Sequence, residues 1–155
     1  MTKRQTKQKF IKERTPDPIK PLTAKQREYL EALKHHDQII VTGCAGTGKS
    51  YIAGTWGADA LRSNRVSKLV ITRPNVPGGR SLGFFPGSLE DKLAPWVAPL
   101  VSILSDRLGA GAYDTAVKAG NIEIVPFEVM RGRTFENAFV ILDETQNTTP
   151  HELKM

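Results

Sequence analysis

The chain has very little cysteine, no long hydrophobic run and few aromatic side chains. Its single cysteine, Cys44, excludes an internal disulfide and is typical of a protein from a reducing compartment. No apolar stretch approaches the roughly 18 residues that a membrane-spanning helix needs. The N-terminus is charged and lacks the hydrophobic region of a signal peptide. We therefore expect a cytoplasmic protein that has no membrane contact.

The chain also lacks a strong excess of charge once its first residues are set aside. The net charge is +6, and residues 1–14 supply +5 of it, from six Lys or Arg and one Glu. We expect residues 1–20 to form a basic flexible arm and residues 21–155 to form one domain. A basic arm can bind the phosphates of RNA or single-stranded DNA. A solvated chain terminus explains the same composition, so both interpretations stay open.

Short apolar runs alternate with helical patterns along the remaining sequence. The apolar runs that predict strands are residues 38–42, 68–72, 122–125 and 139–143. The patterns that predict helices are residues 22–37, 49–62, 88–108 and 113–119, the first with Thr23 and Gln26 as a capping box. Because the strands read as continuous apolar runs between helices, we expect an α/β fold, a buried parallel sheet with helices on both faces.

The glycine-rich stretch GCAGTGKS matches the phosphate-loop pattern of Gly, any four residues, Gly, Lys and Ser. Glycines allow positive φ angles, which turn backbone N–H groups toward an anion, and the N-terminus of the following helix adds its own. Lys49 would neutralise the β- and γ-phosphates, and the Ser50 hydroxyl would bind Mg²⁺. We interpret Cys44 as a small filler rather than a nucleophile. The predicted nucleotide-binding residues are Gly43, Cys44, Ala45, Gly46, Thr47, Gly48, Lys49 and Ser50.

Two adjacent carboxylates follow the last apolar run, FVIL. An acid at the end of a buried strand beside a phosphate loop suits Mg²⁺, and Asp143 has this position. A second carboxylate, Glu144, suits the orientation and deprotonation of water, which favours hydrolysis over transfer to a small acceptor. A nucleotide kinase is disfavoured, because kinases need no such pair. A surface acid at a strand end is the alternative interpretation of Glu144.

Several segments resemble known proteins. Gln26 in LTAKQ, 17 residues before the loop, and DETQ after the last strand resemble the first RecA-like domain of superfamily 1 helicases. The segments VITRPNV, SLGFFPGSLEDKLAPWVAPL and MRGRTFENAFVILDETQNTTPHELKM, together with the loop, resemble the PhoH family of ATP-binding proteins across residues 22–155. This resemblance implies a P-loop NTPase of the additional-strand, catalytic-glutamate type, which uses ATP and Mg²⁺ and is tied in some relatives to RNA handling.

The resemblance also implies roles for individual residues. It supports residues 43–50 for phosphates, Asp143 for Mg²⁺ and Glu144 for water. By the same resemblance, Gln146 senses the γ-phosphate and Gln26 contacts adenine, although its place in the capping box also explains Gln26. The catalytic set that it implies is Lys49, Glu144 and Gln146.

Other side chains are open to more than one interpretation. Arg73, Arg131 and Arg133 follow strands at the same edge as the site. They could contact the γ-phosphate across a subunit boundary in a homo-oligomeric ring, or bind RNA or single-stranded DNA, and surface solvation explains each equally well. Phe84 and Phe85 could stack on a base or anchor a loop in the core.

The resemblance implies a further strand with a polar sensor, between the phosphate-loop strand and the Asp–Glu strand. The sequence contains no such strand, no later arginine finger and no second RecA-like domain. Thr149, Pro150 and Glu152 signal the start of a helix that has too few residues to be stable alone. We therefore expect an incomplete catalytic domain with little ATPase activity by itself. Two classes stay open, an ATP hydrolase and a nucleotide-binding module that does not hydrolyse ATP.

Overall fold

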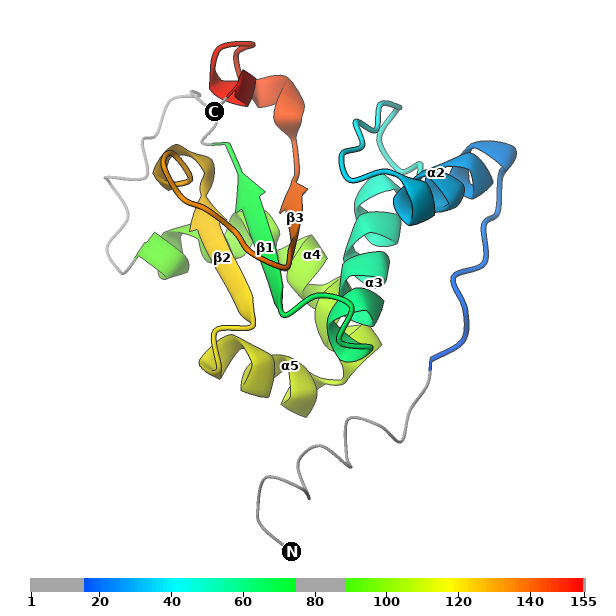
Figure 1. Cartoon of the computed structure of the whole chain (residues 1–155), viewed down its shortest axis with the longest axis horizontal. Coiled ribbons are helices and arrows are strands. Elements are labelled where there is room, and N and C mark those ends of the chain that lie inside the picture. Colours follow the sequence, from blue (N-terminus) through cyan, green and yellow to red (C-terminus); the bar gives the residue numbers. More distant parts are fainter. Residues whose placement is uncertain (1–15, 75–88, 155) are drawn as a thin grey trace, which may run out of the picture.

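The computed structural model describes residues 16–74 and 89–154. Helices and strands are interspersed along this part of the chain (Figure 1), and three of the four predicted strands are present. The helices are α2 Ala24–His35, α3 Lys49–Arg62, α4 Leu89–Leu108 and α5 Ala110–Lys118. The strands are β1 Lys68–Arg73, β2 Ile122–Pro126 and β3 Ala138–Leu142. Three short 3-10 helices are η2 Phe127–Val129, η3 Thr145–Asn147 and η4 Glu152–Lys154.

The three strands form one parallel sheet in the order β2-β1-β3. In this register Leu69 of β1 lies opposite Ile122 of β2 and Phe139 of β3. The central strand is the most buried part of the molecule, since Leu69, Val70 and Ile71 have no exposed surface. The predicted α/β class and parallel sheet are therefore confirmed, and the continuous apolar run of β1 reflects burial on both of its faces.

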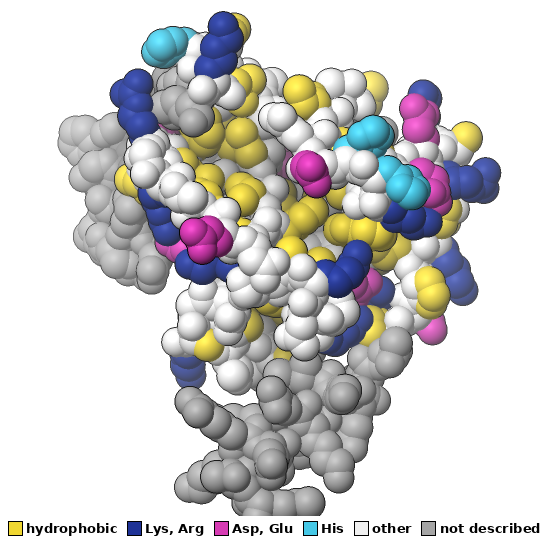
Figure 2. Space-filling model, in the orientation of Figure 1, with side chains coloured by type: hydrophobic (Ala, Val, Ile, Leu, Met, Phe, Trp, Pro, Cys, Tyr) yellow, Lys and Arg dark blue, Asp and Glu magenta, His cyan; other side chains and the backbone are white. Residues whose placement is uncertain are grey.

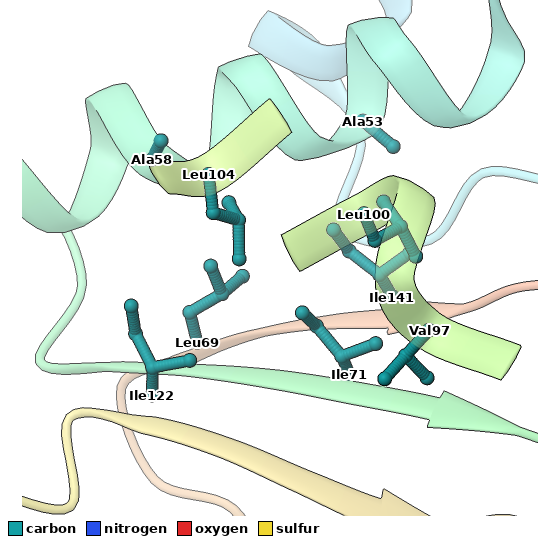
Figure 3. Packing of buried hydrophobic residues seen from close by; sticks show 9 residues of the cluster. All are labelled: Ala53, Ala58, Leu69, Ile71, Val97, Leu100, Leu104, Ile122 and Ile141. Carbon is teal, nitrogen blue, oxygen red and sulfur yellow. The ribbon is translucent and has the colours of Figure 1, made fainter. Parts of the chain in front are cut away.

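Helices α3 and α4 pack together on one face of the sheet, and the hydrophobic core lies between them and the strands (Figure 3). Asp59 of α3 also joins the two helices. It accepts hydrogen bonds from Arg107 of α4 at 2.9 and 2.6 Å and from Arg62 at 2.6 Å. The labelled core residues are Ala53, Ala58, Leu69, Ile71, Val97, Leu100, Leu104, Ile122 and Ile141.

The connection from β2 to β3 crosses in front of β1 in Figure 1, whereas α4 lies behind the strand. Parallel strands require such a return, because the chain leaves the carboxyl end of β2 and must re-enter at the amino end of β3. This path brings residues 143–147, directly after β3, to the same edge of the sheet as the end of β1. The backbone N–H of Asp143 donates to the carbonyl of Thr72 at 3.0 Å.

The predicted strand at residues 38–42 is wrong. The described residues give this segment no strand, and its Ile40 side chain is 82% exposed. A strand exists by pairing with a neighbour, and β3 lies at the edge of the described sheet, with no strand between it and residues 38–42. The sequence pattern of the segment is that of a buried strand, but the described part of the chain supplies nothing for it to pair with.

The helix boundaries follow the sequence signals closely. Thr23 caps α2 by accepting a hydrogen bond from the Gln26 backbone N–H at 3.1 Å. Helix α4 is one continuous helix with Pro95 and Pro99 inside it, and residue 88, at which the predicted helix begins, lies outside the described residues. The predicted helix start after Thr149 yields only η4, with backbone hydrogen bonds from Leu153 N–H to the Thr149 carbonyl at 3.1 Å and from Lys154 N–H to the His151 carbonyl at 3.3 Å.

Candidate functional site

The phosphate-loop pattern folds into an exposed turn that leads directly into α3. Gly43, Gly46 and Gly48 all have positive φ, of 157°, 75° and 86°. Gly48 is the N-cap of α3, and a glycine cap brings no side chain that would occupy the first amides of the helix. A Cβ at Gly48 would lie 3.0 Å from the Gln26 Nε2, so the position favours glycine on two grounds. The turn therefore leaves the helix N-terminus accessible to an anion.

Lys49 folds back across this turn. Its Nζ donates hydrogen bonds to the carbonyls of Gly43 at 2.8 Å and Cys44 at 2.7 Å. The Thr47 hydroxyl donates to the same Cys44 carbonyl at 2.8 Å. The ammonium group has three protons and thus keeps one donor for another acceptor. A positive charge is in this way held within the loop.

The two predicted Mg²⁺ ligands lie together. The Ser50 hydroxyl, at the start of α3, donates to Asp143 Oδ1 at 3.0 Å, although 93 positions separate the residues in the sequence. Both side chains are partly buried at the edge of the sheet where β1 and β3 end. A hydroxyl and a carboxylate are hard oxygen donors of the kind that Mg²⁺ prefers, and two protein ligands leave room for waters and phosphate. The residues present therefore fit this ion.

Glu144 lies beside this pair with an unusual backbone conformation. Its φ of 56° and ψ of 40° are in the left-handed region, which few residues other than glycine adopt. The Gln146 side chain donates a hydrogen bond to Glu144 Oε2. The other carboxylate oxygen, Oε1, lies 3.9 Å from Nη2 of Arg73. Backbone strain of this kind is concentrated at functional sites in proteins.

Gln26 connects α2 to the phosphate loop. Its side-chain Oε1 accepts from the Leu22 N–H at 2.7 Å, and its Nε2 donates to the Thr47 carbonyl at 3.1 Å. The reciprocal capping bond therefore goes to Leu22 rather than to Thr23. The contact places Gln26 at the loop, and its role toward adenine stays a prediction.

Tyr29 of α2 lies close enough to Asp143 to sense its charge, and the sequence motifs give this residue no role. Burial, and then the nearby Asp143 carboxylate, raise the pKa of the Tyr29 phenol above its ordinary value of 10.0. The sequence could have indicated this position, because Tyr29 follows Gln26 by three residues and the two side chains therefore lie on the same face of α2, the face that meets the loop.

The three predicted arginines have different surroundings. Arg73 is mostly buried and faces Glu144. Arg133 donates to Glu123 at 2.7 Å and lies over the Phe135 ring, with its Cζ 4.9 Å from the ring centroid. Arg131 is exposed. The structure thus brings only Arg73 to the candidate site. The predicted stacking residues Phe84 and Phe85, and the basic arm through residue 15, lie outside the described residues.

Hydrophobic side chains reach the surface next to the site. Figure 2 shows them in the region between β3 and α2. Ile40 and Val140 are 82% and 41% exposed, respectively. Over residues 16–74 and 89–154, no helix is long and apolar enough to cross a membrane.

The family model and the individual relatives that match this chain all carry the name PhoH or PhoH-like. A family model described as "PhoH-like protein" matches residues 18–155. The chain is 47% identical over 137 residues to a "PhoH-like protein" of Bacillus subtilis, covering 88% of this chain and 43% of the relative. It is 42% identical over 144 residues to "Protein PhoH" of Escherichia coli K12, covering 92% and 41%. The similarity to a Synechocystis "PhoH-like protein" is 41% over 146 residues, covering 94% and 44%. The chain spans less than half the length of these relatives.

Proposed function

Because the chain belongs to the PhoH-like family, and because Ser50 at the end of its glycine-rich loop contacts Asp143, which directly precedes Glu144, we propose that it binds and hydrolyses ATP with Mg²⁺. The observation that carries this proposal is the 3.0 Å hydrogen bond between Ser50 Oγ and Asp143 Oδ1. It supports a single Mg²⁺ site between the loop and the sheet. Because the chain spans less than half of its relatives' length, ATP hydrolysis by the longer protein is also a proposal.

Each residue has a chemical task in this proposal. The backbone amides of residues 43–50 would hold the phosphates, and the Lys49 ammonium would move from the loop carbonyls to the β- and γ-phosphates. Magnesium, when bound, would neutralise phosphate charge from the side of Ser50 and Asp143. Glu144 would orient a water and take its proton as the water oxygen attacks the γ-phosphorus, while the bond from that phosphorus to the bridging oxygen of the β-phosphate breaks and ADP leaves. Gln146 and Gln26 would contact the γ-phosphate and the adenine.

A second candidate function, ATP binding without hydrolysis, is favoured by one observation. Residues 38–42, which lead into the loop, form no strand, and Ile40 is 82% exposed. Hydrolysis needs atoms held close to their reactive geometry, whereas binding tolerates a looser loop. We accordingly keep the prediction of little turnover by the 155-residue chain alone, and propose that the longer family members are the efficient hydrolases.

We also propose a cytoplasmic location, a homo-oligomeric ring for the longer protein, and RNA or single-stranded DNA as partner. The arm of residues 1–14, with its charge of +5, and the exposed Arg131 support the nucleic-acid contact. Arg133 supports it less, because its guanidinium is already paired with Glu123.

Lys49→Ala tests the proposed nucleotide site. We expect the substitution to weaken the binding of a fluorescent ATP analogue with Mg²⁺ strongly. It should also remove any ATP turnover, since a lost contact to a developing phosphate charge costs about 3–4 kcal/mol. The matched control is Lys25→Ala, because Lys25 is exposed on α2 and pairs with Glu28 at 2.8 Å. Normal ATP binding and turnover by the Lys49 variant would overturn the assignment.

A further inference from the structure

Arg73 connects three elements at the edge of the sheet. It is the last residue of β1, and its side chain is only 19% exposed. Its Nη2 faces Glu144 Oε1 at 3.9 Å, while Gln146 donates to Oε2 of the same carboxylate. Each oxygen of Glu144 therefore faces one donor, and the two donors come from different parts of the chain.

The other side of the Arg73 guanidinium is held by α4. Nη1 donates to the Trp96 carbonyl at 2.8 Å, and the guanidinium carbon lies 5.7 Å from the centroid of the Trp96 ring. That distance is within the range of a cation–π contact. The buried Nε has no hydrogen-bond partner among the described residues. Arg73 is thus fixed by the backbone and the ring of Trp96, and its remaining charge is directed at Glu144.

We propose that Arg73 is a positioning residue for Glu144, holding the carboxylate at the place from which it would activate water. This inference rests on the proposed function, and it adds a residue that the phosphate-loop and Asp–Glu patterns do not contain. A guanidinium that is little exposed is weakly screened by water, so its attraction for the carboxylate is stronger than at an open surface. Glu144 has a left-handed backbone conformation and precedes η3, so it lies outside the regular helices and strands. Packing within such an element therefore does not fix the direction of its side chain, and a partner such as Arg73 can do so.

The alternative is a purely structural role, in which Arg73 only connects β1 to α4 through its contacts with Trp96. The two roles predict different results for substitution. A tie between elements affects stability and every step of the reaction together. A positioning residue affects the rate with Glu144 and leaves Mg²⁺–ATP affinity nearly unchanged, because Lys49, Ser50 and Asp143 are untouched.

The first experiment measures binding and turnover of Arg73→Gln and Arg73→Lys in the full chain. For Arg73→Gln we expect the Kd for Mg²⁺–ATP to stay within about twofold while the single-turnover hydrolysis rate falls about tenfold or more. Arg73→Lys should recover part of the rate, because it retains the charge. Adding Glu144→Gln to Arg73→Gln should slow the reaction no further than Glu144→Gln alone. Equal losses of affinity and rate, or losses that multiply in the double variant, would overturn the proposal.

The second experiment needs no turnover. In a Trp56→Phe background Trp96 is the only tryptophan, because the chain has two. If Arg73 links Glu144 to Trp96, Glu144→Gln should change the Trp96 emission, and this change should vanish when Arg73→Gln is also present. A change that persists without Arg73, or no change with Arg73 present, would overturn the link. The proposed function itself would fail if the unsubstituted chain did not bind Mg²⁺–ATP. The fluorescence measurement would still test the link between Arg73 and Glu144, because it requires no nucleotide.

Arg65 provides the matched control for both experiments. Its guanidinium carbon lies 4.8 Å from the centroid of the Trp56 ring, and its Nε donates to the Ser63 hydroxyl at 3.1 Å. Arg65→Gln therefore removes the same charge and the same kind of aromatic contact at the far end of α3. In the Trp56→Phe background it should leave the Trp96 emission and its response to Glu144→Gln unchanged.

Discussion

Glu144 carries the most specific prediction at the scale of single residues. Glu144→Gln keeps the size of the side chain and can still contact Gln146, but it cannot accept a proton from water. We expect Mg²⁺–ATP binding to stay nearly intact and hydrolysis to fall by roughly a hundredfold or more, the usual scale for loss of a general base. Equilibrium binding and single-turnover hydrolysis measure the two effects. Survival of both would mean that Glu144 is structural.

The residue-scale contacts differ in how far the sequence could predict them. Ser50 and Asp143 were predictable, because a phosphate loop and an acid at a strand end each have a local pattern that fixes their place. The contact of Arg73 with Glu144 was not, because it depends on the register of β1 beside β3 and on the approach of α4. The same holds for Tyr29, whose neighbour Asp143 is far away in the sequence.

At the scale of elements, the packing of α3 on the sheet depends on Gly57. A Cβ at this position would lie 2.8 Å from Leu69 Cδ1 and 3.0 Å from Phe139 Cδ1, inside the buried core. We expect Gly57→Ala to destabilise the fold by about 1–3 kcal/mol, the usual cost of overpacking. Thermal unfolding should show a midpoint lower by about 3–9 °C.

Gly111→Ala is the control for this substitution. Gly111 lies in α5, and an added Cβ would meet no atom within 4 Å. Alanine is the better helix former, so the control should be equally or slightly more stable. If both variants melted alike, close packing at Gly57 would not explain the glycine.

The pair of strands β1 and β2 carries a pH-dependent contact. Burial alone would raise the pKa of Glu123, but hydrogen bonds from Arg133 at 2.7 Å and Lys68 at 3.0 Å lower it below its ordinary 4.5. Because the folded state then binds this proton less readily than the unfolded state, the contact stabilises the fold above pH 4.5. The stabilisation is lost as the pH falls below that value.

Glu123→Gln should therefore flatten the loss of stability in acid. Denaturant unfolding of the parent and the variant between about pH 6 and pH 3.5 measures the difference, which should shrink toward low pH. Glu136→Gln, a change at an exposed carboxylate, is the control. A constant difference across the range would contradict the assigned contact.

The elements themselves were predictable where the local pattern and the tertiary surroundings agree. The helix at residues 49–62 and the strand at 68–72 follow from a glycine turn, helical spacing and a run of branched apolar residues. Residues 38–42 have an equally clear strand pattern. The prediction failed there because a strand also needs a partner, and that requirement cannot be read from the segment itself.

At the scale of the whole molecule, the charge of the chain is concentrated at one end. Deleting residues 1–14 removes +5 of the net +6. If the arm binds nucleic acid, the affinity for RNA or single-stranded DNA should fall and its dependence on salt should become flatter, because fewer counterions are released. Titrations at several salt concentrations measure both quantities.

A charge-neutral arm of full length separates charge from chain length. Unchanged affinity in the deletion would move the contact to the arginines at residues 73, 80, 131 and 133. Absence of binding in every form would exclude nucleic acid as a partner. The control replaces by glutamine the six basic residues Lys3, Arg4, Lys7, Lys9, Lys12 and Arg14 together with Glu13, so that residues 1–14 carry no charged side chain.

The unpaired segment before the phosphate loop has a consequence for the thermodynamics of binding. Residues 38–42 make no strand, and among the described contacts the loop is held by α3 and by the Gln26 bond to Thr47. A triphosphate that gathers the loop amides around itself would therefore order a region that the fold alone leaves weakly held. Part of its intrinsic affinity would be spent on this ordering. Binding and local folding would be one coupled equilibrium, and the nucleotide would act as a structural component of the domain as well as its ligand.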